Sequence, residues 1–254
     1  MGVTWIKSGK DSAALAKQEE EAQERRAQEK GKMWRFMLKP GEEALITFVD
    51  GNLDSEGFLL PDRWYEHSLF MNGRWGNNFV CPEKTNPHSK DKCPICETGD
   101  AAYLCAGFTV IDHRIVKGKN DKEYKDRPKL LVAKPKSFEM LAKYASKLGG
   151  LAGQTFSVSR SKGEQVASIG DVWIPVSKHS VEALKAKYTQ EVTDPKTGKK
   201  NTISVFVPAI YAEEIVYRSG AELRALGLGP SGVTETQVPS NTTALPKTNY
   251  EDEM

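Results

Sequence analysis

Short apolar runs separated by polar turns recur along the middle of the chain. Alternating or continuous apolar runs of this length are typical of β-strands. They predict strands at 34–38, 44–49, 106–116, 129–134, 154–160, 165–176 and 202–210. The few helical stretches do not alternate with these strands in a βαβ rhythm, so we expect a mainly β (α+β) protein with a small antiparallel barrel or sandwich.

Four stretches have helical patterns instead. Residues 11–30 are rich in Ala, Glu, Gln, Lys and Arg, but their apolar face is thin, with a single Leu15. This helix is therefore either an exposed, partner-binding arm or an ordinary solvated helix. Further helices are predicted from Ser137 to about residue 148, at 180–189 and at 219–226.

Length and composition limit the class of protein. The chain has 254 residues, of which 39% are hydrophobic, enough for one sizeable core and a small satellite domain. It has no apolar run of 18 residues and no signal-peptide pattern at its N-terminus. We therefore expect a soluble cytoplasmic protein that contacts no membrane.

Charge is unevenly distributed along the chain. The net charge of +2 predicts no polyanionic partner by itself. However, residues 113–129 hold seven Lys/Arg against three Asp/Glu, whereas residues 231–254 hold one Lys against four acids. Residues 229–254 are mostly Gly, Pro, Ser, Thr and Asn, which predicts a disordered tail with an acidic tip.

A histidine and three cysteines have the spacing of metal ligands. Thirteen residues separate His67 from Cys81, eleven separate Cys81 from Cys93, and two separate Cys93 from Cys96. A Cys-x-x-Cys turn supplies two thiolates from one tight loop, and two distant ligands complete a tetrahedral Zn²⁺ site. The cysteine content fits metal-bound thiolates in a reducing compartment better than a disulfide framework.

The fourth ligand has three candidates. His67 follows a strand-like stretch that can hold it rigidly, whereas His88 lies in a polar, turn-prone loop. Cys105 lies in an apolar stretch and is most simply a buried core thiol. His67 is preferred, and His88 and Cys105 stay open as alternatives.

Catalytic and redox versions of this site fit the sequence less well. A turn rather than a helix follows Cys96, which disfavours a dithiol redox motif. A zinc deaminase needs a His-x-Glu sequence, but Ser68 and Leu69 follow His67. Four protein ligands leave no position for a reactive water, so we expect a structural zinc in a protein that is not an enzyme.

Aromatic and basic side chains gather around this site. Aromatic rings stack on the bases of single strands, while Lys and Arg neutralise phosphates. The candidates for stacking are Trp34, Trp64, Tyr65, Trp75 and Phe79, although at least half of the aromatic residues of this region are expected to be buried. The candidates for phosphate contacts are Arg74, Arg114, Lys117, Lys119, Lys122 and Lys125, with a solvated hairpin tip at 114–129 as the alternative.

The order of these motifs resembles a known family. The segments Trp64–His67, Phe79–Pro82, Cys93–Glu97 and Phe108–Asp112 are similar to those of tailed-phage single-stranded-DNA-binding proteins. These in turn resemble the zinc-containing helix-destabilising protein of T-even phages. The resemblance is specific over 64–112 and loose over 33–217, and it places the family's histidine ligand on His67.

The resemblance implies an OB-fold Greek-key barrel with helical insertions and an embedded structural zinc subdomain. It also implies sequence-independent binding of single-stranded DNA in replication and recombination, in the cytoplasm of the infected bacterial host, with possible self-association on DNA. An acidic tail, here Glu251, Asp252 and Glu253, would recruit replication and recombination proteins. The arm here is mixed in charge rather than basic, which departs from the family.

The expected organisation has three parts. Residues 1–32 form a helical arm, 33–217 form the core with a zinc subdomain at about 64–105, and 218–254 form a short helix and the tail. The alternative function is a zinc-ribbon adaptor in replication or transcription that binds proteins and no strand.

Overall fold

The computed structural model describes residues 12, 32–71, 74–88, 90–117, 121, 123–163, 166–193 and 200–230. Within them the protein is mainly β, as predicted, with one seven-stranded antiparallel sheet and a few helices. The predicted arm, apart from Ser12 and Lys32, and the tail from residue 231 onwards lie outside the described residues.

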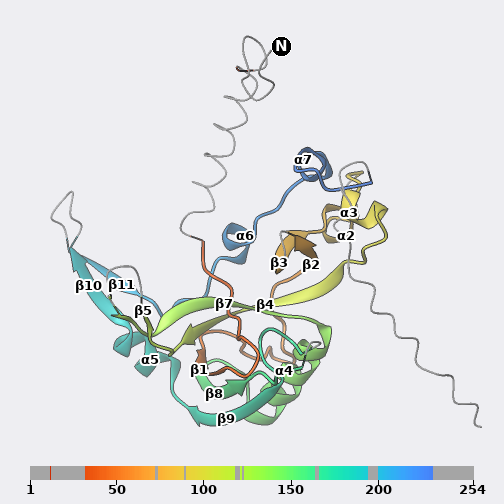
Figure 1. Ribbon diagram of the computed structural model, residues 1–254. Coiled ribbons are helices and arrows are strands. Elements are labelled where there is room, and N and C mark those ends of the chain that lie inside the picture. Colours follow the sequence, from red (N-terminus) through yellow and green to blue (C-terminus); the bar gives the residue numbers. More distant parts are fainter. Residues whose placement is uncertain are drawn as a thin grey trace, which may run out of the picture.

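The main sheet has the strand order β3-β2-β4-β1-β8-β9, and β7 pairs with β4 on its other side (Figure 1). Strand β4 is the longest and pairs with β1, β2 and β7. The strands of this sheet are β1 (Glu43–Phe48), β2 (Arg63–Met71), β3 (Arg74–Val80), β4 (Tyr103–Asp112), β7 (Arg127–Ala133), β8 (Gln154–Ser159) and β9 (Val172–Lys178).

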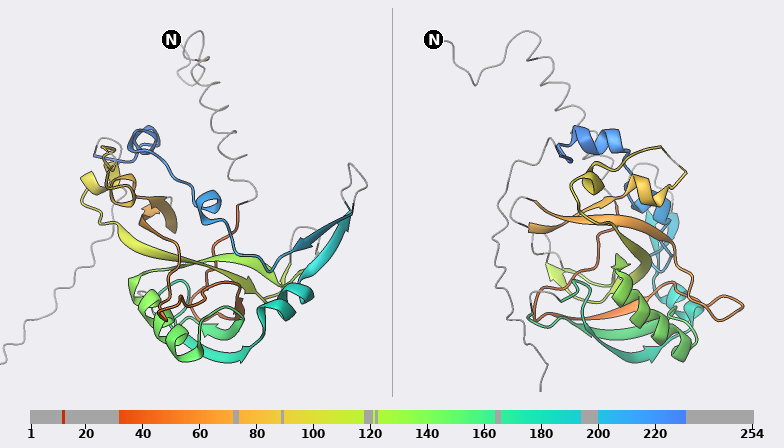
Figure 2. Two further views of the ribbon diagram at one scale, coloured as in Figure 1. Left: turned by 180° about the vertical axis from the view of Figure 1, so that it is seen from behind. Right: turned by 90° about the vertical axis from the view of Figure 1, so that its right-hand side faces the viewer.

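Helices and two small hairpins surround this sheet. Figures 1 and 2 show α4 at one end of the molecule and α2, α3 and α7 with the β2–β3 hairpin at the other, while the β10–β11 hairpin projects to the side. These elements are α2 (Pro82–Thr85), α3 (Pro94–Glu97), β5 (Val116–Lys117), β6 (Glu123–Tyr124), α4 (Pro135–Leu148), α5 (Val181–Lys187), β10 (Thr189–Thr193), β11 (Lys200–Ser204), α6 (Tyr211–Glu214) and α7 (Gly220–Ala225).

The sheet is not closed into the barrel that we predicted. Strands β7 and β9 are edges, and no ladder joins them in the part of the chain that the structure describes. The extended segment 34–38 instead forms hydrogen bonds with two separate parts of the chain. The Phe36 amide donates to the Leu130 carbonyl (2.8 Å), and the Leu38 amide donates to the Ser168 carbonyl (2.7 Å). Because its hydrogen bonds go to two elements, the strand predicted at 34–38 is reduced to one bridge at Arg35.

Aromatic rings form the core beneath the sheet. Phe48 contacts Phe108 and Phe156 edge to face, with ring centroids 5.8 and 5.6 Å apart, and all three are fully buried. Helix α4 packs Leu141 and Ala145 against this cluster. The core therefore combines strands β1, β4 and β8 with one helix.

Helix α4 begins earlier than its sequence pattern predicted. Its N-cap is Lys134 and its first residue is Pro135, whereas Ser137 is buried inside the first turn. Proline suits this first position because its φ is already helical and its missing N–H has no partner to lose there. The helix ends, as predicted, at Gly149, whose φ of +69° is left-handed.

Strand β2 belongs to two parts of the molecule. Its first half pairs with β4 and its second half with β3, and Glu66 is in register with Tyr103 on one side and Val80 on the other. The buried Glu66 carboxylate accepts two hydrogen bonds from the Arg35 guanidinium, at 2.8 and 2.7 Å, and one from the Trp64 indole at 3.1 Å. This network ties the segment that precedes β1 to the strand that carries His67.

Candidate metal centre

The β2–β3 hairpin supports the candidate ligands. His67 lies in β2, in register with Phe79 of β3. Cys81 and Cys93 are the N-cap residues of the one-turn helices α2 and α3, each of which starts with a proline. Cys96 lies within α3, one turn after Cys93.

The structure brings the four predicted ligands together. The ligand atoms of His67, Cys81, Cys93 and Cys96 all lie within 4.8 Å of one another. His67 Nε2 lies 3.4 Å from Cys93 Sγ and 3.5 Å from Cys96 Sγ, and the sulfurs of Cys81 and Cys96 are 3.6 Å apart. A tetrahedral zinc with ordinary bond lengths separates its sulfur and nitrogen ligands by about 3.5–3.8 Å. The four side chains are therefore placed to hold a metal ion, consistent with zinc.

The two alternative ligands lie elsewhere. Cys105 is buried in β4, where it packs with Trp64 and Val80, as expected of a core thiol. Burial, together with the charge of Glu66, raises the pKa of the Cys105 thiol. His88 is exposed and does not join the ligand cluster.

Asp100 orients the histidine. Its Oδ1 lies 2.7 Å from His67 Nδ1, so His67 can present Nε2 to the two sulfurs. Burial alone would lower the pKa of His67, but hydrogen bonds with Cys93 and Asp100 outweigh it and raise that pKa. Metal-bound histidines usually donate their second nitrogen to a carboxylate, so Asp100 completes the expected surroundings of a ligand.

Asp100 was not among the predicted site residues. The available signal was a Gly99-Asp100 pair shortly after Cys96, where Gly99 with φ of +89° turns the chain back toward His67. Turn-forming sequences of this kind are common, so the pair identifies a partner of His67 only once the position of the histidine is known.

Protonation of the thiols opposes metal binding. Burial raises the pKa of Cys96 to about 12, and the hydrogen bond with Cys81 adds to the rise. Because metals bind the thiolate, an arriving ion must displace a proton from Cys96. Affinity for the ion therefore increases with pH.

Comparison with protein-family models, curated proteins and solved structures finds no match. The site must therefore be interpreted from its own residues. Among the described residues, no helix is both long enough and apolar enough to cross a membrane.

Helix α7 packs over the cysteines. Leu223 and Leu228 join Ile95 in one buried cluster with Cys81 and Cys93. At the start of α7, a side chain on Gly220 would meet the Lys92 carbonyl oxygen at 2.1 Å, so only glycine fits this close approach. The helix that the sequence placed in the C-terminal segment 218–254 thus covers the metal centre.

The aromatic residues predicted for stacking divide into two groups. Trp64 is only 6% exposed and donates its indole N–H to Glu66, so it is a packing residue in this structure. Tyr65 and Phe79 are half-buried against the cysteine cluster. Trp34, by contrast, is 77% exposed. Trp75, like its neighbour Arg74, lies in β3 with its side chain outside the described part.

The predicted cations also divide. The Arg114 guanidinium is bound by acids: Nη2 donates to Asp112 at 2.6 Å and Nη1 to Glu42 at 2.7 Å. Two acidic partners neutralise its charge, so Arg114 is a poor phosphate ligand. Lys117, in β5, and Lys125, which follows β6, are both exposed. The remaining candidates lie outside the described residues: Lys119, Lys122, Glu251, Asp252 and Glu253.

The structure adds a cation that was not among the candidates. Lys129 of β7 holds its ammonium 5.1 Å from the centroid of the Trp34 ring, within the range of a cation–π contact. Burial and the nearby charge of Arg127 lower the pKa of Lys129. The signal in the sequence was its position: Lys129 is a basic residue that alternates along β7 with the core residues Leu131 and Ala133.

Proposed function

We propose that this protein binds single-stranded DNA without sequence preference and uses a structural zinc ion to hold its β2–β3 hairpin in place. The observation that carries the proposal is the exposed Trp34 ring, which lies against the ammonium of the buried Lys129, while Lys117 and Lys125 are exposed cations. A ring that accepts a base face and cations that accept phosphates are the two requirements of such binding.

The strand order supports an OB-fold as the framework for this function. Strands β1, β4, β7, β8 and β9 are five antiparallel strands in the spatial order β7-β4-β1-β8-β9. An OB-fold is a five-stranded, partly open Greek-key barrel that binds oligonucleotides on its second and third strands. In this numbering those strands are β4 and β7.

The metal has a structural role in this proposal. Zn²⁺ bound by His67, Cys81, Cys93 and Cys96 has no free coordination position, so we propose no enzymatic activity. Following the resemblance, we place the protein in phage DNA replication and recombination in the cytoplasm of the infected host. Glu251, Asp252 and Glu253 are then the contacts for replication and recombination proteins.

The test removes the exposed ring. Trp34→Ala should weaken binding of an oligo-dT strand by about 1–3 kcal/mol, which is roughly 5- to 150-fold, because one stacked base is lost. The measurement is fluorescence anisotropy of a labelled strand at several salt concentrations, with quenching of tryptophan emission as the second readout. Phe58→Ala is the matched control, because Phe58 is 59% exposed and has no role in the proposal.

Equal affinities of the Trp34→Ala and Phe58→Ala variants would remove the main support for this proposal. A wild-type protein with no micromolar affinity for any strand would contradict it altogether. Such a result would favour the adaptor, the second candidate, which is supported by the packing of Trp64, Tyr65 and Phe79 within the protein.

A further inference from the structure

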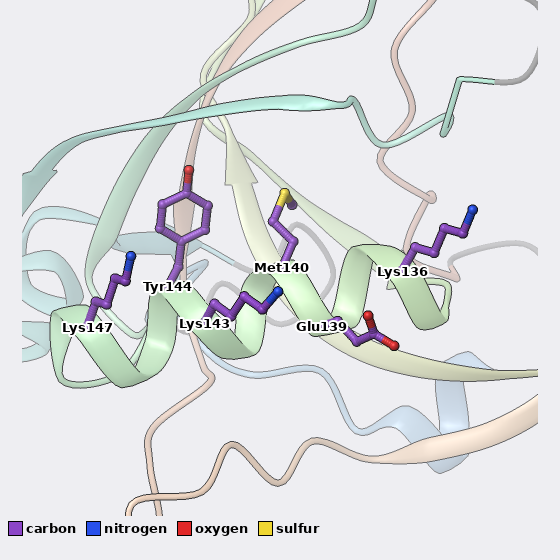
Figure 3. Close-up of a pocket in the computed structure, with 6 residues that line it drawn as sticks. All are labelled: Lys136, Glu139, Met140, Lys143, Tyr144 and Lys147. Carbon is purple, nitrogen blue, oxygen red and sulfur yellow. The ribbon is translucent and has the colours of Figure 1, made fainter. Parts of the chain in front are cut away.

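Helix α4 carries a basic groove at the end of the molecule away from the metal centre (Figures 1 and 3). The groove has a volume of about 330 Å³ and is lined by Lys136, Glu139, Met140, Lys143, Tyr144 and Lys147. Figure 3 shows the three lysines, Met140 and Tyr144 projecting from the same side of the helix. None of these residues belongs to the candidate sites described above.

The lysine spacing explains why these side chains share one side. Lys143 lies seven positions after Lys136, and Lys147 lies four positions after Lys143, which brings the three to one face of a helix with 3.6 residues per turn. At a rise of 1.5 Å per residue, the three positions extend over roughly 16 Å of the helix axis. A row of this kind suits a polymer with repeated negative charges.

Their charges are not neutralised by neighbouring acids. Across the described residues, no ion pair engages any of the three lysines, and all three are exposed. Lys178 of β9 differs because its ammonium donates to the Leu148 carbonyl, at the C-terminal end of α4, at 2.9 Å. The groove therefore presents three available cations against the single acid Glu139.

The floor of the groove is firmly positioned. The Tyr144 hydroxyl donates to the Trp173 carbonyl at 2.7 Å, and the Tyr144 ring packs on Phe156 with centroids 5.3 Å apart. Tyr144 remains half-buried and lines the groove. A fixed aromatic ring between cations favours a nucleic-acid strand over an acidic peptide, because it offers a base a surface as well as its phosphates a charge.

We propose that the groove formed by Lys136, Lys143 and Lys147 on α4 binds the sugar–phosphate backbone of a single strand. This inference rests on the proposed function, because it gives the same ligand a second contact surface. A strand that reaches both Trp34 and α4 covers more nucleotides than Trp34 alone can bind.

The test is the salt dependence of strand binding by a triple variant, Lys136→Gln, Lys143→Gln and Lys147→Gln. Each lost phosphate contact lowers the slope of log affinity against log salt by about 0.7, so the slope should fall by about 2. Between 50 and 200 mM salt, the wild-type protein should then lose about 16-fold more affinity than the triple variant. Glutamine keeps good helix propensity, and an unchanged thermal midpoint verifies the fold.

A second triple variant separates this inference from a general effect of charge. Lys39→Gln, Lys90→Gln and Lys185→Gln remove the same charge from exposed positions on three other segments, and should keep nearly the wild-type slope. Equal slopes for the two triple variants overturn the α4 site. A wild-type protein that binds no strand overturns the proposed function instead. If the α4 variant loses affinity only for poly-glutamate, the groove is a protein-binding surface and the inference is wrong.

Discussion

The sheet core and the metal centre are stabilised in different ways. In the core, the buried rings of Phe48, Phe108 and Phe156 contact one another between strands that are distant in sequence. Around the metal ligands, the buried apolar side chains are fewer and mostly aliphatic, namely Ile95, Leu223 and Leu228. Burial of apolar surface is therefore the main source of stability in the first region and a minor one in the second.

This difference shows how one chain orders a segment that cannot bury a core of its own. The β2–β3 hairpin, α2 and α3 are too short to bury much apolar surface, and such small units usually need metals or disulfides. A metal ion held by His67, Cys81, Cys93 and Cys96 would supply that stability at a single point. We therefore expect different treatments to unfold the two regions.

The largest effect should follow the loss of a metal ligand. Cys93→Ala should reduce the metal content from one ion per chain to none, because structural zinc sites contribute about 10–16 kcal/mol in small domains. Amide hydrogen exchange should then become fast in α2, α3 and the second half of β2, while β1 and β8 stay protected. Metal analysis and exchange on the same sample provide the measurement.

Cys105→Ala is the control for this change, since it removes a buried thiol outside the ligand cluster. This variant should keep one ion per chain. Loss of the ion from Cys105→Ala, or its retention by Cys93→Ala, would contradict the assignment of the ligands.

A core substitution should act in the opposite region. Phe156→Ala should lower the free energy of unfolding by about 3–5 kcal/mol, because it leaves a cavity among packed rings. The folded variant should still bind one metal ion. Urea denaturation followed by circular dichroism measures the loss, and Phe58→Ala, an exposed phenylalanine, should change it by less than about 1 kcal/mol. A metal-free but folded Phe156→Ala protein would show that the two regions are not independent.

The smallest effect concerns the pH dependence of stability, which should have opposite directions in the two regions. Burial raises the pKa of Asp50 to about 6, although hydrogen bonds from Tyr211 and the Thr109 amide partly oppose the rise. The folded state then binds the proton more tightly than the unfolded state does. The stabilisation is complete below about pH 4 and is lost as the pH rises through about 6, at a cost of about 3 kcal/mol.

The metal centre should respond in the reverse direction, because its ligands bind an ion only after they lose protons. Asp50→Asn should flatten the pH dependence of the core between about pH 4 and 7 and leave the pH dependence of metal content unchanged. Urea titrations of metal-loaded wild-type and variant protein at several pH values measure the first quantity. If the stability of the wild-type core rises over this pH range, and the Asp50→Asn variant has the same pH dependence, then Asp50 does not determine the pH dependence of the core.

Local patterns were sufficient for part of this structure. Strands β1 and β8 and helices α5 and α7 lie close to their predicted ranges, because each has a clear alternation or a serine cap, such as Ser180 and Ser219. The metal ligands were also accessible, since their residue types and spacing indicate the chemistry without knowledge of the fold. The Asn72-Gly73 pair was a further signal, because such pairs favour tight turns between strands, but no hairpin was predicted in this part of the chain.

The other predictions failed where partners are distant in sequence. Arg114 was assigned to phosphates because nothing in its own segment indicates the contact with Glu42, 72 residues away. The alternation of segment 34–38 is real, yet its hydrogen bonds go to two different elements, so it is not a strand. Trp64 was predicted to stack on bases, but in the fold it contacts Glu66 and packs with Cys105.

The shared strand β2 has a mechanical consequence. Glu66 is paired on both sides, so the backbone passes from the main sheet into the metal-bearing hairpin without a hinge. The Arg35 guanidinium acts as a brace at this junction. Because one continuous strand joins the hairpin to the sheet, we expect the two regions to move as one unit rather than about a flexible linker.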